Sequence, residues 1–393
     1  MQKVLKFPKN FLWGSATSSY QIEGGIKNCD WARFYDAGRA CDHYNKYKKD
    51  FDLLKRLNQN AYRFSIEWSR IEPKQGKFDR NEIEHYREVL RTLKNCGIKT
   101  IVTLHHFTNP LWLIKIGGWA DSKVIFYFSR FAEKMLKEYQ DLVDFWLTIN
   151  EPLIYSLMGY LNGKWPPNKK NLLLFLKVVE NQIASHKKIY RIFHQIDPKV
   201  KIGIAKNNQY FEPLNPKSEL DKFSTALCRY FWNGYFLNKI KNHLDFIGLN
   251  YYLHYRIKFP FFRENENKIV NDIGWEIYPK GIYCVLKSLK KYDLPVYITE
   301  NGLADAEDKL RKDFIKEHLF WTYKAVQEKV DVRGYFHWSL MDNFEWEKGF
   351  EPRFGLVEVD YETMERKFRP SAFYYAEICK NNAVTINSEI NNF

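Results

Sequence analysis

The feature that most constrains the fold is a series of eight short apolar runs spread along the whole chain. Each run is rich in β-branched and aromatic residues and is followed by a turn and a longer amphipathic stretch. The runs span residues 11–17, 61–68, 100–105, 145–149, 201–205, 246–251, 296–299 and 334–340. Their centres lie about 40 to 55 residues apart, which exceeds the roughly 30 residues of a minimal strand–helix–strand unit. The pattern therefore predicts strands that alternate with helices.

Helical periodicity fills the intervals between these runs. Residues 42–57 place Tyr44, Tyr47, Phe51 and Leu54 three or four positions apart, as on the buried face of a helix. Similar spacing recurs in residues 81–95, 124–139, 174–193, 281–292 and 308–327. We therefore predict an α/β fold, a single (β/α)₈ TIM barrel over residues 1–380. Residues 381–393 are polar and rich in asparagine, and we expect them to form a frayed C-terminal tail.

Composition excludes several classes of protein. Hydrophobic residues make up 45% of the chain and aromatic residues 17%, enough for a large core, so disorder is excluded. The six cysteines are scattered without a CxxC pair, which argues against a disulfide framework or a zinc site. The most apolar stretch, residues 172–179, is short and interrupted by Lys177. We expect a cytoplasmic protein with no membrane partner, no metal and no cofactor.

The formal net charge of +14 raises the question of an acidic polymer as partner. Clusters such as Lys187–Lys188 and Lys290–Lys291 lie at helical spacing beside apolar positions, as solvated helix faces do. We therefore expect no nucleic-acid partner. The sequence leaves the oligomeric state open.

Polar and aromatic residues lie on or just after most of the predicted strands. Barrel enzymes build their sites at the C-terminal ends of the strands, so these residues are the first candidates for catalysis and binding. They are Gln21, Arg63, His105, His106, Asn150, Glu151, Asn250, Tyr252, Glu300, Trp338, Glu345 and Trp346.

Two glutamates stand out because each ends a hydrophobic strand. Glu151 follows the fourth predicted strand, and Glu300 follows the seventh. Strands four and seven lie opposite each other in a closed barrel of eight, so the two carboxyl groups can converge over its mouth. Glycoside hydrolysis needs such a pair, because one carboxyl group protonates the departing oxygen while the other attacks the anomeric carbon.

Seven segments then resemble glycoside hydrolase family 1, the β-glucosidase family, in the family's order from about Phe7 to Ile378. They read FLWGSATSSYQIEG (11–24), YRFSIEWSRI (62–71), TLHHF (103–107), TINEP (148–152), GLNYY (248–252), ITENG (298–302) and HWSLMDNFEW (337–346). The resemblance implies a retaining β-glycosidase that releases sugars from the non-reducing end. Its substrate would be a small β-glycoside or short oligosaccharide.

The resemblance also implies roles for individual residues. Glu151 would be the acid/base and Glu300 the nucleophile, with Arg63 and Tyr252 bonded to Glu300. Asn150 would bind the 2-hydroxyl group of the sugar, and Trp338 would form its stacking floor. The other hydroxyl groups would be held by Gln21, His106, Glu345 and Trp346. A cation and a phenol beside Glu300 should favour its ionised form, and its charge should raise the pKa of Glu151.

Some positions depart from branches of the family. Phospho-glycosidases carry a serine where this chain has Glu345, and a lysine and a tyrosine where it has Pro352 and Phe354. An unphosphorylated sugar is therefore expected. Plant thioglucosidases lack the acid/base glutamate, whereas Glu151 is present here.

Several alternatives stay open at this point. A transglycosidase would share every residue that contacts the sugar, and a catalytically silent sugar-binding barrel is a second rival. β-Glucoside, β-galactoside and β-fucoside cleavage all remain possible, and the natural aglycone is not specified. His105 could be a core residue, and Asn207 or Asn208 could face the leaving group, although a loop-capping role is favoured.

Overall fold

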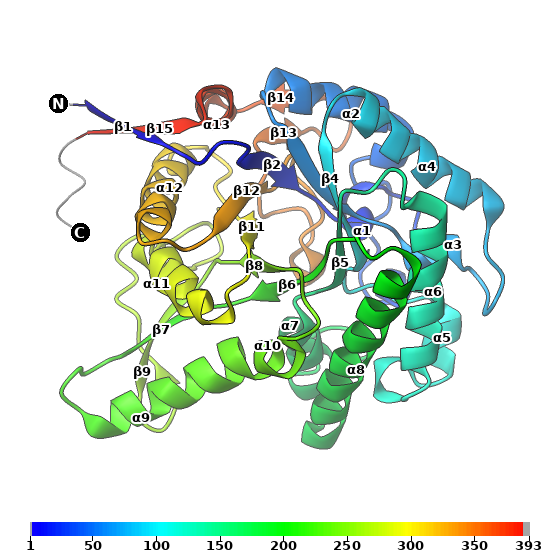
Figure 1. Cartoon of the computed structure of the whole chain (residues 1–393), viewed down its shortest axis with the longest axis horizontal. Helices are drawn as coiled ribbons and strands as arrows, with labels where there is room; N and C mark the ends of the chain where they lie inside the picture. The colour runs from blue at the N-terminus through cyan, green and yellow to red at the C-terminus, as the bar shows by residue number, and fades with distance from the viewer. Residues whose placement is uncertain (1, 388–393) are drawn as a thin grey trace.

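In the computed structural model, which describes residues 2–387, the eight predicted strands close into a parallel barrel (Figure 1). Its strands are β2 (Leu12–Ala16), β3 (Ala61–Ser65), β4 (Lys99–His105), β5 (Phe145–Asn150), β6 (Ile202–Asn207), β8 (Phe246–Asn250), β11 (Val296–Asn301) and β12 (Val332–Trp338). They pair in this order, and β12 returns to β2 with Gly334 opposite Leu12. The predicted TIM barrel is confirmed.

Helices surround the barrel, with at least one helix after each barrel strand (Figure 1). They are α2 (His43–Arg56), α4 (Arg80–Asn95), α6 (Val124–Tyr139), α8 (Leu172–Ile196), α10 (Tyr235–Ile240), α11 (Lys280–Leu289), α12 (Arg311–Gln327) and α13 (Pro370–Asn381). Helix α4 shows how the sequence specifies them. The Asp79 side chain caps its N-terminus, and Ile83, Tyr86, Leu90 and Leu93 form its buried face. Among the described residues, no helix is long and apolar enough to cross a membrane.

The barrel interior combines large rings with very small residues. Phe145, Phe246 and Tyr297 pack edge to face or tilted, with ring centroids 5.2 to 5.7 Å apart. Gly203 on β6 lies against this cluster, where an added Cβ would come within 2.7 Å of the Phe246 ring. Interior positions of a small barrel therefore alternate in size so that the core can fill without strain.

The C-terminus corrects one expectation. Instead of fraying from residue 381, the chain forms β15 (Ala383–Asn387), which pairs antiparallel with β1 (Gln2–Lys6). The alternation of Val384 and Ile386 accounts for the strand, because both side chains are buried. The polar composition of residues 381–393 masked this alternation of buried and exposed positions in the sequence. The rest of the predicted tail, residues 388–393, lies outside the described residues.

Two excursions from the barrel were absent from the sequence prediction. After β6 the chain forms β7 (Tyr210–Pro213), α9 (Glu219–Cys228) and the π-helical turn η4 (Arg229–Gly234). After β8 it forms β9 (His254–Lys258) and β10 (Phe262–Arg263), and these strands join β7 in a small sheet of order β10-β9-β7. A further pair, β13 (Val357–Val359) and β14 (Arg366–Phe368), precedes α13.

We predict that Gly203→Ala lowers the free energy of unfolding by about 1 to 3 kcal/mol, because a methyl group has no room beside the Phe246 ring. Gly234→Ala is the matched control, since its Cβ would meet no atom closer than 3.5 Å and its φ is −94°. This control should be neutral or stabilise by up to about 1 kcal/mol. Denaturant unfolding of both variants measures the difference, and equal stabilities would contradict the packing argument.

Candidate active site

A pocket of about 220 Å³ opens at the C-terminal ends of the barrel strands. Eight of the predicted site residues line it, namely His106, Asn150, Glu151, Tyr252, Glu300, Trp338, Glu345 and Trp346. Ile154, Met158, Trp165, Leu253, Ile273 and Trp275 also line it. The pocket therefore combines two strand-end carboxyl groups with aromatic and apolar walls, a composition typical of a sugar-binding cleft.

Glu151 lies between β5 and the short helix α7 (Pro152–Ser156), in the left-handed conformation with φ 44°. Its Oε1 accepts hydrogen bonds from Asn250 Nδ2 at 2.9 Å and Asn207 Nδ2 at 3.1 Å. Burial, and secondly the negative charge of Glu300, raise the pKa of Glu151 to about 7, although the two amides oppose this shift. Glu151 can therefore carry a proton near neutral pH and deliver it to a substrate.

Glu300 lies on β11, and both of its carboxyl oxygens have strong donors. Arg63 Nη1 lies 2.5 Å from Oε1, and the Tyr252 hydroxyl group donates to Oε2 at 2.8 Å. Burial raises the pKa of Glu300 above its ordinary value, although the Arg63 cation and the Tyr252 hydroxyl group oppose this shift. The ion pair favours a carboxylate at this position, and a carboxylate is the form that a nucleophile requires.

Arg63 lies beneath the pocket and is fully buried. Its Nη2 donates to Asn150 Oδ1 at 2.7 Å, and its Nη1 also donates to the Thr299 carbonyl oxygen at 3.0 Å. Asn150 contacts His106 through its amide nitrogen, at 3.1 Å from Nε2. Arg63 therefore orients Glu300 directly and fixes the Asn150 amide toward His106.

An aromatic wall faces the two carboxyl groups. The His106 ring lies nearly parallel to the indoles of Trp338 and Trp346, with centroids 5.9 and 6.0 Å away. Burial, with the nearby Arg63 charge, holds the pKa of His106 well below its ordinary value. Neutral His106 can offer its ring nitrogen to a hydroxyl group without adding charge to the pocket.

Glu345 and Gln21 occupy different depths of the site. Glu345 lines the pocket and accepts from Trp338 Nε1 at 3.2 Å, and burial raises its pKa to about 8. Gln21 is fully buried, and its amide is bonded to Ser18, Asn343 and the Phe344 carbonyl group. Gln21 therefore supports the segment that carries Glu345, and it does not line the cavity itself.

Two asparagines bond the acid/base carboxyl group, a role that the sequence did not assign to either. Asn250, a strand-end candidate without an assigned role, bonds both Asn150 and Glu151, and Asn207 bonds Glu151, although the sequence favoured a loop-capping role. Asn207 is also the last residue of a barrel strand, and this position is the signal that could have found it. His105 packs in the core against Trp119 and bonds Asn109.

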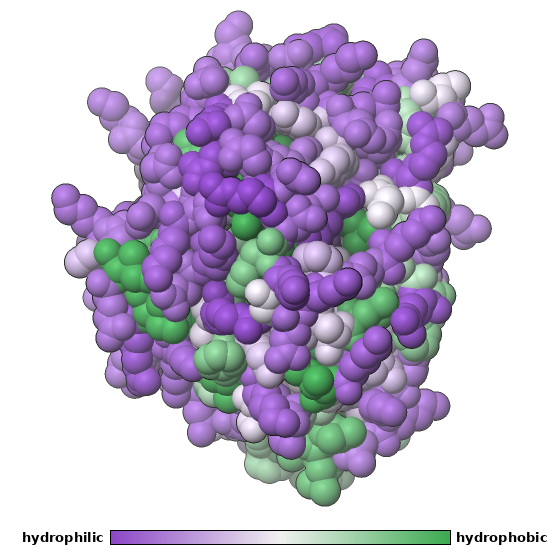
Figure 2. Space-filling model, turned by 90° about the vertical axis from the view of Figure 1, so that its right-hand side faces the viewer, coloured by the Kyte–Doolittle hydropathy of each residue, from purple (hydrophilic) through white to green (hydrophobic). Residues whose placement is uncertain are grey.

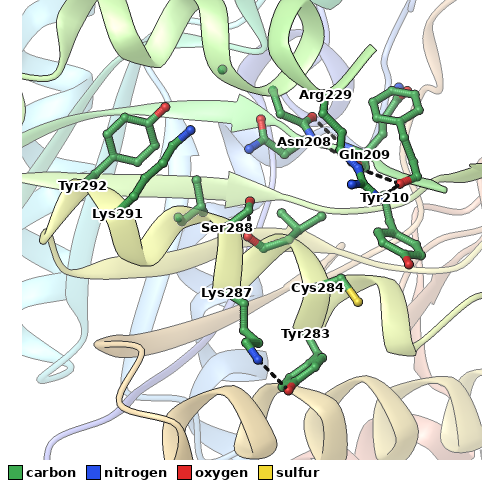
Figure 3. A pocket seen from close by; sticks show the side chains of 15 residues that line it. Asn208, Gln209, Tyr210, Arg229, Tyr283, Cys284, Lys287, Ser288, Lys291 and Tyr292 are labelled. Atoms are coloured by element: carbon green, nitrogen blue, oxygen red, sulfur yellow. Dashed lines mark hydrogen bonds between the residues drawn. The ribbon is translucent and has the colours of Figure 1, made fainter. Parts of the chain in front are cut away.

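A larger hollow of about 510 Å³ lies outside the barrel between β7, η4 and α11 (Figure 3). Asn208, Arg229, Lys287 and Lys291 are among its lining residues, and the lining contains no aspartate or glutamate. Lys287 already donates to the Tyr283 hydroxyl group at 3.2 Å. The hollow therefore lacks the paired carboxyl groups that the barrel mouth provides.

A closed β/α barrel with two buried, differently partnered carboxyl groups at its mouth defines a barrel glycoside hydrolase. Known proteins extend this conclusion. The model of glycosyl hydrolase family 1 matches residues 3–242 and 236–384. β-Glucosidase A from Thermotoga maritima is 36% identical, with 97% of this chain and 99% of that protein covered. The chain belongs to glycosyl hydrolase family 1 and is a retaining β-glycosidase of the β-glucosidase type.

Solved structures agree with this assignment. A β-glycosidase from Pyrococcus horikoshii superposes with a TM-score of 0.92 at 40% identity, covering 99% of this chain and 97% of that one. β-Glucosidase from Thermotoga maritima in complex with glucoimidazole superposes with a TM-score of 0.92 at 34% identity, covering 96% of this chain and 99% of that one. The barrel is thus shared over essentially the whole length.

We expect kcat/KM to fall as the pH rises through about 7. The reaction needs protonated Glu151, and Glu151, whose pKa is raised to about 7, loses its proton in this range. Asn207→Ala removes a donor that favours ionised Glu151, so its basic limb should move to higher pH. Asn208→Ala is the matched control, because the Asn208 side chain makes no hydrogen bond within the described part of the chain. A limb that moves to lower pH in Asn207→Ala would contradict the assignment.

Proposed function

We propose that the enzyme hydrolyses unphosphorylated β-glycosides from the non-reducing end by a double displacement, with Glu300 as nucleophile and Glu151 as acid/base. The observation that carries this proposal is the unequal environment of the two carboxyl groups. Glu300 is paired with a cation and a phenol, whereas Glu151 receives only amide donors. The first environment suits a carboxylate and the second a proton donor.

In the first step, a Glu300 oxygen forms a bond to the anomeric carbon while the bond to the glycosidic oxygen breaks. The proton of Glu151 passes to that oxygen, and the alcohol leaves. In the second step, Glu151 takes a proton from water, and the water oxygen displaces Glu300 from the anomeric carbon. The sugar regains its β-configuration, and both carboxyl groups return to their starting states.

The sugar would lie on the aromatic wall. Trp338 provides a flat face for its ring, while His106, Asn150, Glu345 and Trp346 present donors and acceptors around the pocket. Gln21, expected from the sequence to hold a hydroxyl group, would instead position Glu345 through its bonds to Asn343 and the Phe344 carbonyl group. Arg63 and Tyr252 would keep Glu300 ionised and correctly oriented.

The lining of the pocket supports a neutral sugar. Glu151, Glu300, Glu345 and Glu347 line it, and Lys348 is its only lining cation among the described residues. A phosphate dianion would therefore find a single lining cation and four carboxyl groups. Similar proteins are named β-glucosidase and, in Pyrococcus woesei, β-galactosidase at 31% identity, so we propose gluco- and galacto-configured substrates.

We also propose that the enzyme works in the cytoplasm on small soluble glycosides, without a metal or an organic cofactor. All six cysteines are free thiols, which suits a reducing compartment. The two carboxyl groups supply both the nucleophile and the proton, so the reaction needs no further reagent than water.

We predict that Glu300→Ala abolishes turnover and that added azide restores cleavage with an α-configured glycosyl azide. Azide then attacks from the side that Glu300 occupied, with a single inversion. Glu151→Ala should instead give a β-configured azide, chiefly from substrates with activated leaving groups. Nuclear magnetic resonance of the products distinguishes the two, and exchanged configurations would reverse the assignment.

A second measurement tests the substrate class. The kcat/KM for nitrophenyl β-glucoside should exceed that for its 6-phosphate by at least about 100-fold, or roughly 2.7 kcal/mol of transition-state discrimination. The nitrophenyl β-galactoside, measured beside them, controls for general tolerance of changed sugars. Equal rates for the phosphorylated and unphosphorylated glucosides would refute the neutral-sugar proposal and leave the carboxylate roles intact.

A further inference from the structure

A group of large hydrophobic side chains is exposed on the excursions outside the barrel. They come from three parts of the chain: the start of α8, the α9–η4 segment, and the turn between β9 and β10. The apolar patch consists of Leu172, Leu173, Leu176, Leu220, Phe223, Tyr230, Phe231, Phe259, Phe261 and Phe262, which are 46% to 76% exposed. Scattered exposed apolar residues need no explanation, but a contiguous group marks an interaction surface.

The three parts of the apolar patch lie next to one another. Leu176, Phe231 and Phe261 line one groove of about 460 Å³, which brings all three parts together. The backbone nitrogen of Phe259 donates to Asp221 Oδ1 at 3.0 Å, which joins the β9–β10 turn to the start of α9. Figure 2 shows hydrophobic side chains gathered at the lower end of the molecule, where Figure 1 places one end of α8. The three parts of the apolar patch therefore meet at this groove.

Cations accompany the apolar patch on each of its parts. Lys170 and Lys177 flank the leucines of α8, Arg229 begins η4, and Arg263 ends β10. None of these four forms a salt bridge within the described residues. The acidic neighbours already have partners: Glu180 bonds Tyr235, Glu219 bonds Lys222, Asp221 accepts from the Phe259 backbone nitrogen, and Glu264 pairs with Lys258. The apolar patch thus combines exposed rings and leucines with four cations that form no salt bridge within the described residues.

We propose that the apolar patch docks on the surface of a lipid bilayer that contains anionic headgroups. Phenylalanine and leucine side chains enter the boundary between headgroups and acyl chains, and lysine and arginine side chains bind the headgroups. A second copy of the chain is the poorer partner, because docking through the same surface would place these cations against their own equivalents. The barrel remains outside the bilayer, so this contact with the membrane surface departs from the sequence-based expectation of no membrane partner but requires no membrane-crossing helix, and none is found among the described residues.

Flotation of the full-length enzyme with vesicles tests the proposal. We expect binding to vesicles of phosphatidylcholine with about 30% phosphatidylglycerol, and much weaker binding to phosphatidylcholine alone. The double variant Phe231→Ser/Phe261→Ser should lower the partition coefficient for anionic vesicles at least about tenfold. Both side chains are more than half exposed, so the fold should be unaffected.

Phe126→Ser/Phe373→Ser is the matched control, since these rings are 55% and 56% exposed but lie outside the apolar patch. It should bind vesicles as the unmodified enzyme does. A third variant, Lys170→Gln/Lys177→Gln/Arg263→Gln, should lose about tenfold in binding to anionic vesicles only. Hydrolysis of a nitrophenyl glycoside without vesicles, equal in all variants, verifies folding.

Three outcomes would overturn the proposal. The unmodified enzyme could fail to float with anionic vesicles, or both phenylalanine variants could lose binding equally. Alternatively, sedimentation could show a dimer that only Phe231→Ser/Phe261→Ser disrupts, which would make a second copy the occupant of the apolar patch.

Discussion

The buried ion pair between Arg63 and Glu300 is the interaction on which the rest of the site depends. Arg63 lies on β3 and Glu300 on β11, and the same guanidinium group also bonds Asn150 on β5, so one cation joins three strands across the barrel. Both partners are buried. Loss of either one would leave an uncompensated charge in the core, at a cost of about 3 to 5 kcal/mol. The nucleophile is therefore held by the same contact that stabilises the barrel mouth.

The division of labour between the two carboxyl groups follows from what surrounds each of them. Glu300 is paired with the Arg63 cation. Burial and the negative charge of Glu300 together raise the pKa of Glu151 to about 7. Asn207 and Asn250 limit that shift, because their amides favour the ionised state that Glu151 must enter when its proton leaves. Glu151 can thus donate a proton in one step and accept a proton in the next at the same pH.

The segments that leave the barrel after β6 and β8 contribute both to the catalytic pocket and to the outer surface of the molecule. Where they leave the barrel lie Asn207, the last residue of β6, and Tyr252, just after β8, which bond the two carboxyl groups. Further out they form the β10-β9-β7 sheet and α9, which expose the apolar patch. The same segments therefore link the catalytic pocket to the surface that we propose for lipid docking, although the two sites share no residue.

The sequence by itself determined the barrel and its reactive groups. Strand and helix periodicity is local, and Glu151 and Glu300 end apolar runs that any parallel barrel must bring to one rim. Only the tertiary structure decided which amides reach Glu151, that Gln21 lies beneath the pocket, and that residues 383–387 pair with β1. The physical reason is that these contacts join positions far apart in the chain. A side chain's partner in such a contact depends on how the strands are placed in space, and local periodicity carries no information about that placement.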